Sequence, residues 1–202
     1  MYYIKRGVVV VSAYGDFFKP YFASGTLRPC DGSVWVIHNG ANSDTDYEWK
    51  MHVAAYDVAD WLRVAGTIMP WMIQNGVTFK TISPDDFSVE RILSPTCCQY
   101  AKAFTIYPTS APEFAKIACG LDALMCGAKL RTDTKLTAGH NMSYERALGH
   151  SGRIFYRMER DGMGRYMSTE RAYRMNPACP YNPLNVPDPF ANLFARAVPA
   201  HT

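Results

Sequence analysis

The stretch Trp49-Lys-Met-His-Val-Ala-Ala55 decides the fold. Its large apolar residues alternate with polar ones, which is typical of a strand that buries one face in a core. Because successive side chains of a strand point to opposite faces, Lys50 and His52 stand side by side on one face, while Trp49 and Met51 point to the other. A lysine and a histidine therefore share one strand face.

The residues around this strand add helices and further strands. Apolar residues spaced at i, i+3, i+4 and i+7 predict an amphipathic helix over 57–75, which Pro70 should bend or split. A capping box at Ser110-Ala-Pro-Glu113 predicts a second helix, which ends at Gly127. Runs of β-branched and aromatic residues predict strands over 7–12, 33–38, 77–82, 103–107 and 152–158.

The order of these elements predicts an α+β fold with a single, mostly antiparallel sheet and helices packed on one face. The uncovered face would then carry Lys50 and His52. We expect residues 1–190 to form one domain and residues 191–202 to be a C-terminal tail. From Asn176 onward the sequence is rich in proline and is expected to pack as extended coil.

Composition argues against several classes of protein. The chain has 202 residues, of which 48% are hydrophobic, so it is long enough to fold around a sizeable core. A net charge of +3 is too small to indicate nucleic-acid binding. It has no run of 18 apolar residues and no signal peptide, so we expect no membrane partner. Six cysteines without a C-x-x-C spacing favour a reduced, cytoplasmic protein without a metal site.

Arginines are concentrated late in the chain. Seven of them lie between Arg146 and Arg174, against three acidic residues, and no lysine follows Lys135. The forked guanidinium group binds phosphate at two points, so this segment supplies candidates for an anion site. A solvated basic strip, or a surface that binds RNA or another polyanion, explains the same composition, although the interleaved aromatic platform of such binders is missing.

Taken alone, Lys50 and His52 leave two interpretations open. A lysine and a histidine on one face, near several arginines, suit acid–base chemistry on an anionic substrate. The same pattern is also that of a polar pair that faces solvent on an edge strand. Other motifs of the chain are needed to decide between the two.

Five motifs follow one another along the chain. They are Trp49-Lys-Met-His-Val53, Val77-Thr-Phe-Lys-Thr81, Lys102-Ala-Phe-Thr-Ile-Tyr-Pro108, Gly152-Arg-Ile-Phe-Tyr-Arg157, and Arg160-Asp-Gly162 with Asp188-Pro-Phe190. In this order they resemble the lyase domain of class III and class IV lanthipeptide synthetases and of stand-alone, class V-like lyases. The Lys-x-His strand and the Arg-Asp-Gly turn are also similar to bacterial phosphothreonine lyase effectors.

The resemblance implies β-elimination of phosphate from phosphoserine or phosphothreonine, without a cofactor. It makes Lys50 the general base that takes the α-proton, and His52, as imidazolium, the general acid that protonates the leaving phosphate. Tyr107 would hydrogen-bond beside them. The residues that the resemblance places around the phosphate are Lys80, Arg91, Arg157 and Arg160.

Such a base must be an unprotonated amine, because the α-proton of a peptide is very weakly acidic. Neighbouring cations lower the pKa of Lys50, and the phosphate dianion of the substrate raises it. The effectors carry a second lysine where this chain has Thr78, so we expect less positive charge around the phosphate unless Arg165 or Lys102 compensates.

The resemblance also implies partners. The chain carries no Gly-rich kinase loop, no His-Arg-Asp motif and no zinc-binding cyclase pattern. We therefore expect a phosphorylated precursor peptide as the substrate in lanthipeptide-type biosynthesis, made by a separate Ser/Thr kinase and used by a separate cyclase. Two alternatives are a host-directed phosphothreonine lyase effector and a non-catalytic subunit that binds phosphopeptides.

Overall fold

The structure, a computed structural model, describes residues 3–4, 7–8, 14–30, 32–40, 47–97, 99–132, 145–159 and 186–195. Its strands are β1 (Tyr3–Ile4), β2 (Gly7–Val8), β3 (Arg28–Pro29), β4 (Trp35–His38), β5 (Trp49–Ala54), β6 (Phe79–Ile82), β7 (Lys102–Ile106), β8 (Arg146–Leu148) and β9 (Ile154–Met158). Seven of them form one antiparallel sheet in the order β3-β4-β6-β7-β5-β9-β8, while β1 and β2 pair separately. The predicted α+β fold with an antiparallel sheet is confirmed.

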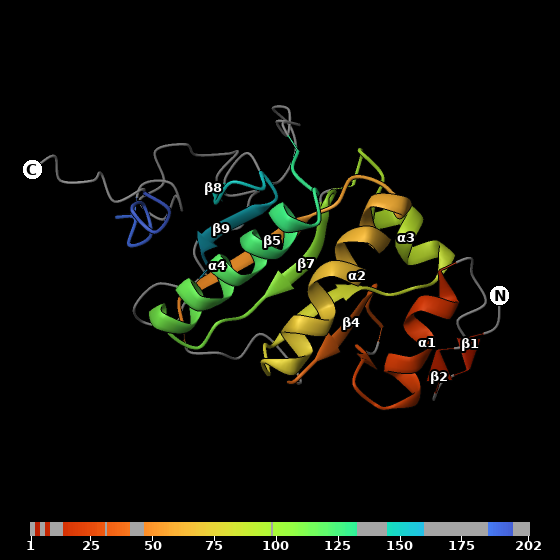
Figure 1. Cartoon of the computed structure of the whole chain (residues 1–202). Coiled ribbons are helices and arrows are strands. Elements are labelled where there is room, and N and C mark those ends of the chain that lie inside the picture. The colour runs from red at the N-terminus through yellow and green to blue at the C-terminus, as the bar shows by residue number, and fades with distance from the viewer. Residues whose placement is uncertain are drawn as a thin grey trace, which may run out of the picture.

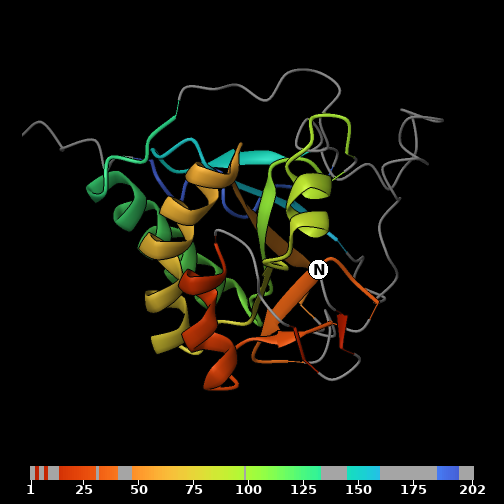
Figure 2. The same cartoon turned by 90° about the vertical axis from the view of Figure 1, so that its right-hand side faces the viewer.

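The helices are α1 (Gly15–Ala23), α2 (Val58–Gln74), α3 (Asp86–Ile92) and α4 (Ala111–Gly127). Helices α2 and α4 run side by side across one face of the sheet, and α1 lies on the same side (Figures 1 and 2). A Cβ atom added to Gly120 of α4 would lie 2.6 Å from the Trp71 ring of α2, so only glycine permits this contact. The Phe18 ring of α1 stacks on Trp61 of α2, which donates a hydrogen bond to Thr81 of β6.

The predicted helices agree closely with the observed ones. Asp57 caps α2 and accepts a hydrogen bond from the backbone of Asp60, and Ser110 caps α4. Of the two effects expected at Pro70, a bend or a split, the split is wrong, because α2 runs through this residue as one helix. Pro70 lacks the N–H that would reach the carbonyl of Gly66, but Gly66 is exposed, so water can satisfy that carbonyl.

Several smaller elements differ from the prediction. The strand expected over 7–12 is β2, and residues 9–13 lie outside the described part. The last strand begins at Ile154 instead of Gly152, since Gly152 has a φ of +72° and belongs to the β8–β9 connection. The elements that the sequence pattern did not indicate are α1, α3, β1, β3 and β8. Within the described ranges, no helix is long and apolar enough to cross a membrane.

The β8–β9 connection is held by a buried carboxylate on α4. Asp122 is 3% exposed and accepts hydrogen bonds from the backbone N–H groups of His150 and Ser151. Gly149, at a φ of +81°, lies so close that a Cβ atom there would be 2.5 Å from the Asp122 carboxylate. Asp122 therefore fixes the hairpin that leads into β9.

Asp122→Ala is expected to lower the free energy of unfolding by about 3 kcal/mol, because two buried N–H groups lose a charged acceptor. Asp122→Asn keeps one carbonyl acceptor and should cost about half as much. Urea denaturation of both variants measures this difference. Equal stability of wild type and Asp122→Ala would contradict the anchoring role.

A second anchor comes from residues 186–195, which the sequence predicted as coil. Phe190 is 4% exposed, stacks on Phe114 of α4 with ring centroids 3.7 Å apart, and meets the edge of Trp49 on β5. Asp188 accepts hydrogen bonds from Tyr156 of β9. This late segment thus completes the core beside the first residue of β5.

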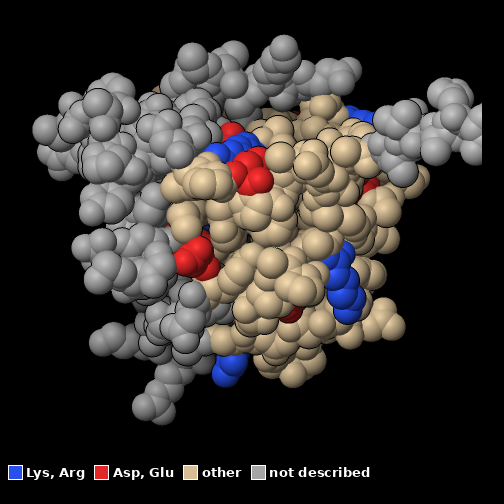
Figure 3. Space-filling view, turned by 90° about the vertical axis from the view of Figure 1, so that its left-hand side faces the viewer, with Lys and Arg blue, Asp and Glu red and all other residues tan. Residues whose placement is uncertain are grey.

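Charged side chains are scattered on the one side of the molecule that Figure 3 shows. On the side of the molecule seen in Figure 3, a few Lys, Arg, Asp and Glu side chains lie among uncharged ones and do not gather into a strip. Within the arginine-rich segment, Arg153 is buried and pairs with Asp60, and Arg146 lies 3.6 Å from Asp188. These two arginines therefore form ion pairs within the fold.

Candidate active site

Four predicted site residues share the sheet face that points away from α2 and α4. In the register of the sheet, Lys50 on β5 lies opposite Arg157 on β9. His52 lies opposite Thr105 on β7, which lies opposite Lys80 on β6. Paired residues on neighbouring antiparallel strands project from the same face. The chain therefore brings a histidine, two lysines and an arginine together.

The sequence suggested that this face of the sheet is open to solvent, but the Lys50 and His52 side chains on it are buried. Lys50 is 8% exposed and His52 is 2% exposed. Strand β5 lies between β7 and β9 in the sheet, so the interpretation of a polar pair on a solvent-facing edge strand is wrong. Two carboxylates lie against these side chains: Glu145 just before β8 and Glu159 just after β9. Buried polar groups are thus paired, as an apolar surrounding requires.

Lys50 forms an ion pair and a hydrogen bond with Glu159, whose backbone N–H donates to the carbonyl of Glu48. Burial and, to a smaller extent, the charge of Arg157 lower the pKa of the Lys50 ammonium to about 7, although Glu159 acts in the opposite direction. Near neutral pH a substantial fraction of Lys50 is therefore the free amine that a general base must be.

The pKa of Lys50 predicts how activity depends on pH. A base that works as the free amine loses activity as pH falls, so kcat/KM should fall about tenfold per pH unit below about 7. Arg157→Met removes a cation and should move this limb to higher pH. Glu159→Gln removes an anion and should move it to lower pH. Shifts of the same sign in both variants, measured on a phosphopeptide, would contradict Lys50 as the titrating base.

His52 belongs to a buried three-residue cluster, His52–Glu145–Lys102. Its Nδ1 atom lies 2.6 Å from Glu145 Oε2, and Glu145 Oε1 lies 3.0 Å from Lys102 Nζ. Burial lowers the pKa of His52 to about 3, with Lys102 and Lys50 acting in the same direction and Glu145 against it. Burial would raise the pKa of Glu145, but its interactions with His52 and Lys102 hold that pKa well below its usual range. In the free protein His52 is thus neutral and bonded to a carboxylate.

The remaining predicted residues are spread more widely. Lys80 Nζ lies 4.8 Å from the Trp35 ring centre and 6.0 Å from that of Tyr107, and burial lowers its pKa. Tyr107 itself is 5% exposed. Arg91 is exposed on α3, with its guanidinium 5.8 Å from the ring of Phe87, and the described residues give it no contact with the other predicted site residues.

Arg160 lies outside the described residues, and so does Arg165. The phosphate-binding roles of Arg91 and Arg160 therefore stay predictions. Lys102, which the sequence offered as a further phosphate ligand, instead contacts Glu145.

Sequence reasoning missed the two carboxylates. Strand alternation after Arg157 places Glu159 on the same face, so that residue carried a usable signal. Glu145 carried none, because it precedes a three-residue strand whose pairing depends on the fold. No group of three or more His, Cys, Asp or Glu in the described ranges is arranged to hold a metal ion.

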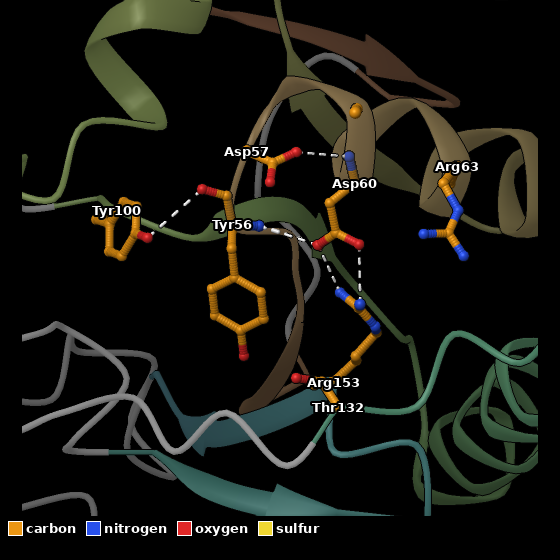
Figure 4. A pocket seen from close by; sticks show the side chains of 8 residues that line it. Tyr56, Asp57, Asp60, Arg63, Tyr100, Thr132 and Arg153 are labelled. Carbon is orange, nitrogen blue, oxygen red and sulfur yellow. Dashed lines mark hydrogen bonds and ion pairs between the residues drawn. The ribbon is translucent and has the colours of Figure 1, made fainter.

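A surface pocket of about 420 Å³ lies beyond the end of β5 and contains none of the predicted site residues (Figure 4). Inside it, Arg153 donates to both carboxylate oxygens of Asp60 at 2.8 Å and to the carbonyl of Ala54. This pairing ties the first turn of α2 to the start of β9. The remaining lining residues are Tyr56, Asp57, Ala59, Arg63, Tyr100 and Thr132. We interpret the pocket as structural.

The fold and the buried face define an α+β protein with a seven-stranded antiparallel sheet, in which the interior strand β5 carries the Lys-x-His pair. This fold is shared with the type III effector and phosphothreonine lyase OspF from Shigella flexneri, at a TM-score of 0.51 and 14% identity over 81% of this chain and 83% of that one. The phosphothreonine lyase SpvC, an effector protein from Salmonella, is also similar, at a TM-score of 0.47 and 11% identity over 75% of this chain and 73% of that one.

Comparison by sequence adds nothing to this. No family model matches the chain, and no curated protein matches it. The likeness to OspF establishes the fold, and the predicted connection to lanthipeptide synthetases stays a prediction.

Proposed function

We propose that this chain is a phosphothreonine or phosphoserine lyase that acts on a peptide by β-elimination. The observation that carries the proposal is the buried pair of Lys50 and His52 on a face that also holds Lys80 and Arg157. A base with a lowered pKa, a potential acid and cations for the phosphate are the groups that this reaction needs. The fold shared with OspF supports the same chemistry.

In the proposed reaction, the amine of Lys50 takes the α-proton of the phosphorylated residue. The electron pair of the broken C–H bond forms the Cα=Cβ double bond, and the Cβ–O bond breaks. His52 donates its proton to the departing oxygen, so inorganic phosphate and a dehydroamino acid result. The bound phosphate dianion raises the pKa of His52, so the imidazole takes up from water the proton that it lacks in the free protein and then donates it to the leaving oxygen.

Lys80 and Arg157 would hold the phosphate and stabilise the charge that moves onto it. Arg91, Arg160 and Tyr107 complete the proposed set. Lys80 is also the second candidate for the base, because it shares the face of His52 and burial lowers its pKa. If Lys80→Ala abolishes turnover while Lys50→Ala only weakens substrate binding, the two lysines exchange roles.

Two kinds of substrate are proposed. A precursor peptide, phosphorylated by a separate kinase and later used by a cyclase, follows from the motif resemblance to lanthipeptide synthetases. A folded signalling protein follows equally well from the likeness to OspF, a type III effector. Comparison of kcat/KM on a short phosphothreonine peptide and on the same sequence within a folded phosphoprotein separates the two.

The test of the proposal is the mass of the peptide product. A phosphothreonine peptide, incubated without metal or nucleotide, should lose about 98 Da through elimination, whereas a phosphatase would remove about 80 Da. Lys50→Ala and His52→Ala should abolish the change. An unchanged peptide that stays bound would replace the proposal with a phosphopeptide-binding subunit.

A further inference from the structure

We infer that Lys102 is a positioning residue for His52 and that it acts through Glu145. Lys102 holds the Glu145 carboxylate in place and neutralises part of its charge, and this carboxylate in turn contacts the His52 imidazole. The consequence of this positioning for catalysis rests on the proposed lyase function. The arrangement of the His52, Glu145 and Lys102 side chains does not depend on that function.

The three side chains form a closed, buried cluster. Side-chain exposure is 3% for His52, 0% for Glu145 and 3% for Lys102. Each carboxylate oxygen of Glu145 faces a different partner: Oε2 lies 2.6 Å from the imidazole and Oε1 lies 3.0 Å from the ammonium. Oε1 accepts no well-directed hydrogen bond among the described residues, so its contact with Lys102 is an ion pair. Glu145 is therefore shared between a catalytic candidate and a lysine.

The sheet is built so that Lys102 reaches this cluster. In regular alternation from Phe104, Lys102 would point into the helix-covered core. A register shift between Val53 and Ala54 instead pairs Lys102 with Ala54, on the face of His52. Ala101, just before Lys102, has a φ of +64°, which non-glycine residues rarely adopt. Bulges of this kind re-aim side chains.

The charge of Lys102 decides how strongly Glu145 holds a proton on His52. A buried carboxylate with no counter-ion would bind the imidazolium tightly and make it a poor acid. With Lys102 beside it, Glu145 orients the Nδ1–H group and leaves the proton on the ring easier to release. The other charged groups on this face are Lys50, Lys80 and Arg157, all cations, while Glu159 is paired with Lys50.

The experiment is an NMR titration of the His52 imidazole in the full chain without substrate, in five proteins. These are the wild type, Lys102→Met, Lys102→Arg, Glu145→Gln and the double variant of Lys102→Met with Glu145→Gln. Lys102→Met should raise the proton affinity of His52 at least about tenfold, and Lys102→Arg should restore it. In the Glu145→Gln background, Lys102→Met should raise the proton affinity of His52 by a clearly smaller factor, because only the direct repulsion between Lys102 and His52 is then lost.

An unchanged His52 titration in Lys102→Met would overturn the inference. So would an equal rise in both backgrounds, which would mean that Lys102 acts on His52 directly. If Lys102→Met does not fold, the double variant, which has lost both charges, can be compared with Glu145→Gln. A rise of about tenfold in the proton affinity of His52 between these two proteins would show direct action of Lys102 and would overturn the inference. The titration needs no turnover, so a protein that eliminates no phosphate but shows the expected shift refutes the proposed function alone.

Discussion

Replacing Lys50 with alanine is expected to lower kcat for phosphate elimination by about 10²- to 10⁴-fold, the usual contribution of a positioned acid or base. His52→Ala should cost a similar factor. Both losses follow from the burial of these side chains on one strand face, which limits the access of water that could replace them in proton transfer. Initial rates on a phosphothreonine peptide measure them.

A matched control is available on α4. Lys116 is an exposed lysine on the helix layer, so Lys116→Ala should leave kcat unchanged. Wild-type activity in a correctly folded Lys50→Ala protein would contradict the assignment of Lys50 as base and would point to Lys80.

Phe190→Ala should lower the free energy of unfolding by about 3–5 kcal/mol, the cost of emptying a buried aromatic site. The ring stacks on Phe114 and contacts Trp49 and Tyr156, so its loss leaves a cavity where β5 begins. Urea denaturation gives the value. Because the cavity lies beside β5, activity should also fall at temperatures where the variant is still folded.

Phe87 is the control for this variant, since it is 54% exposed on α3. Phe87→Ala should change stability by less than about 0.5 kcal/mol. A Phe190→Ala protein as stable as Phe87→Ala would show that residues 186–195 are not part of the core.

The strand at the centre of the site was predictable from local pattern. Alternation over residues 49–55 gave both the strand and the common face of Lys50 and His52, because the side-chain period of a strand depends on nothing distant. The first long helix followed from apolar spacing, and the second from the capping box at Ser110, in the same way.

The environment of the site was not predictable. Lys102 reaches Glu145 only through a register shift, which reverses the face that alternation assigns to it. Glu145 meets His52 across 93 positions of sequence, and no local pattern encodes such a contact. Asp188 and Phe190 likewise sit in a proline-rich stretch, where only the partners Tyr156 and Phe114 give them a place.

The most direct measurement uses a phosphothreonine peptide that carries deuterium at Cα. The account predicts that the wild-type protein, without metal or nucleotide, removes phosphate together with this deuterium, a loss of about 99 Da, and that Lys50→Ala does neither. A product that has lost about 80 Da and kept its deuterium would contradict the account, because the phosphate would then have left by hydrolysis without proton abstraction.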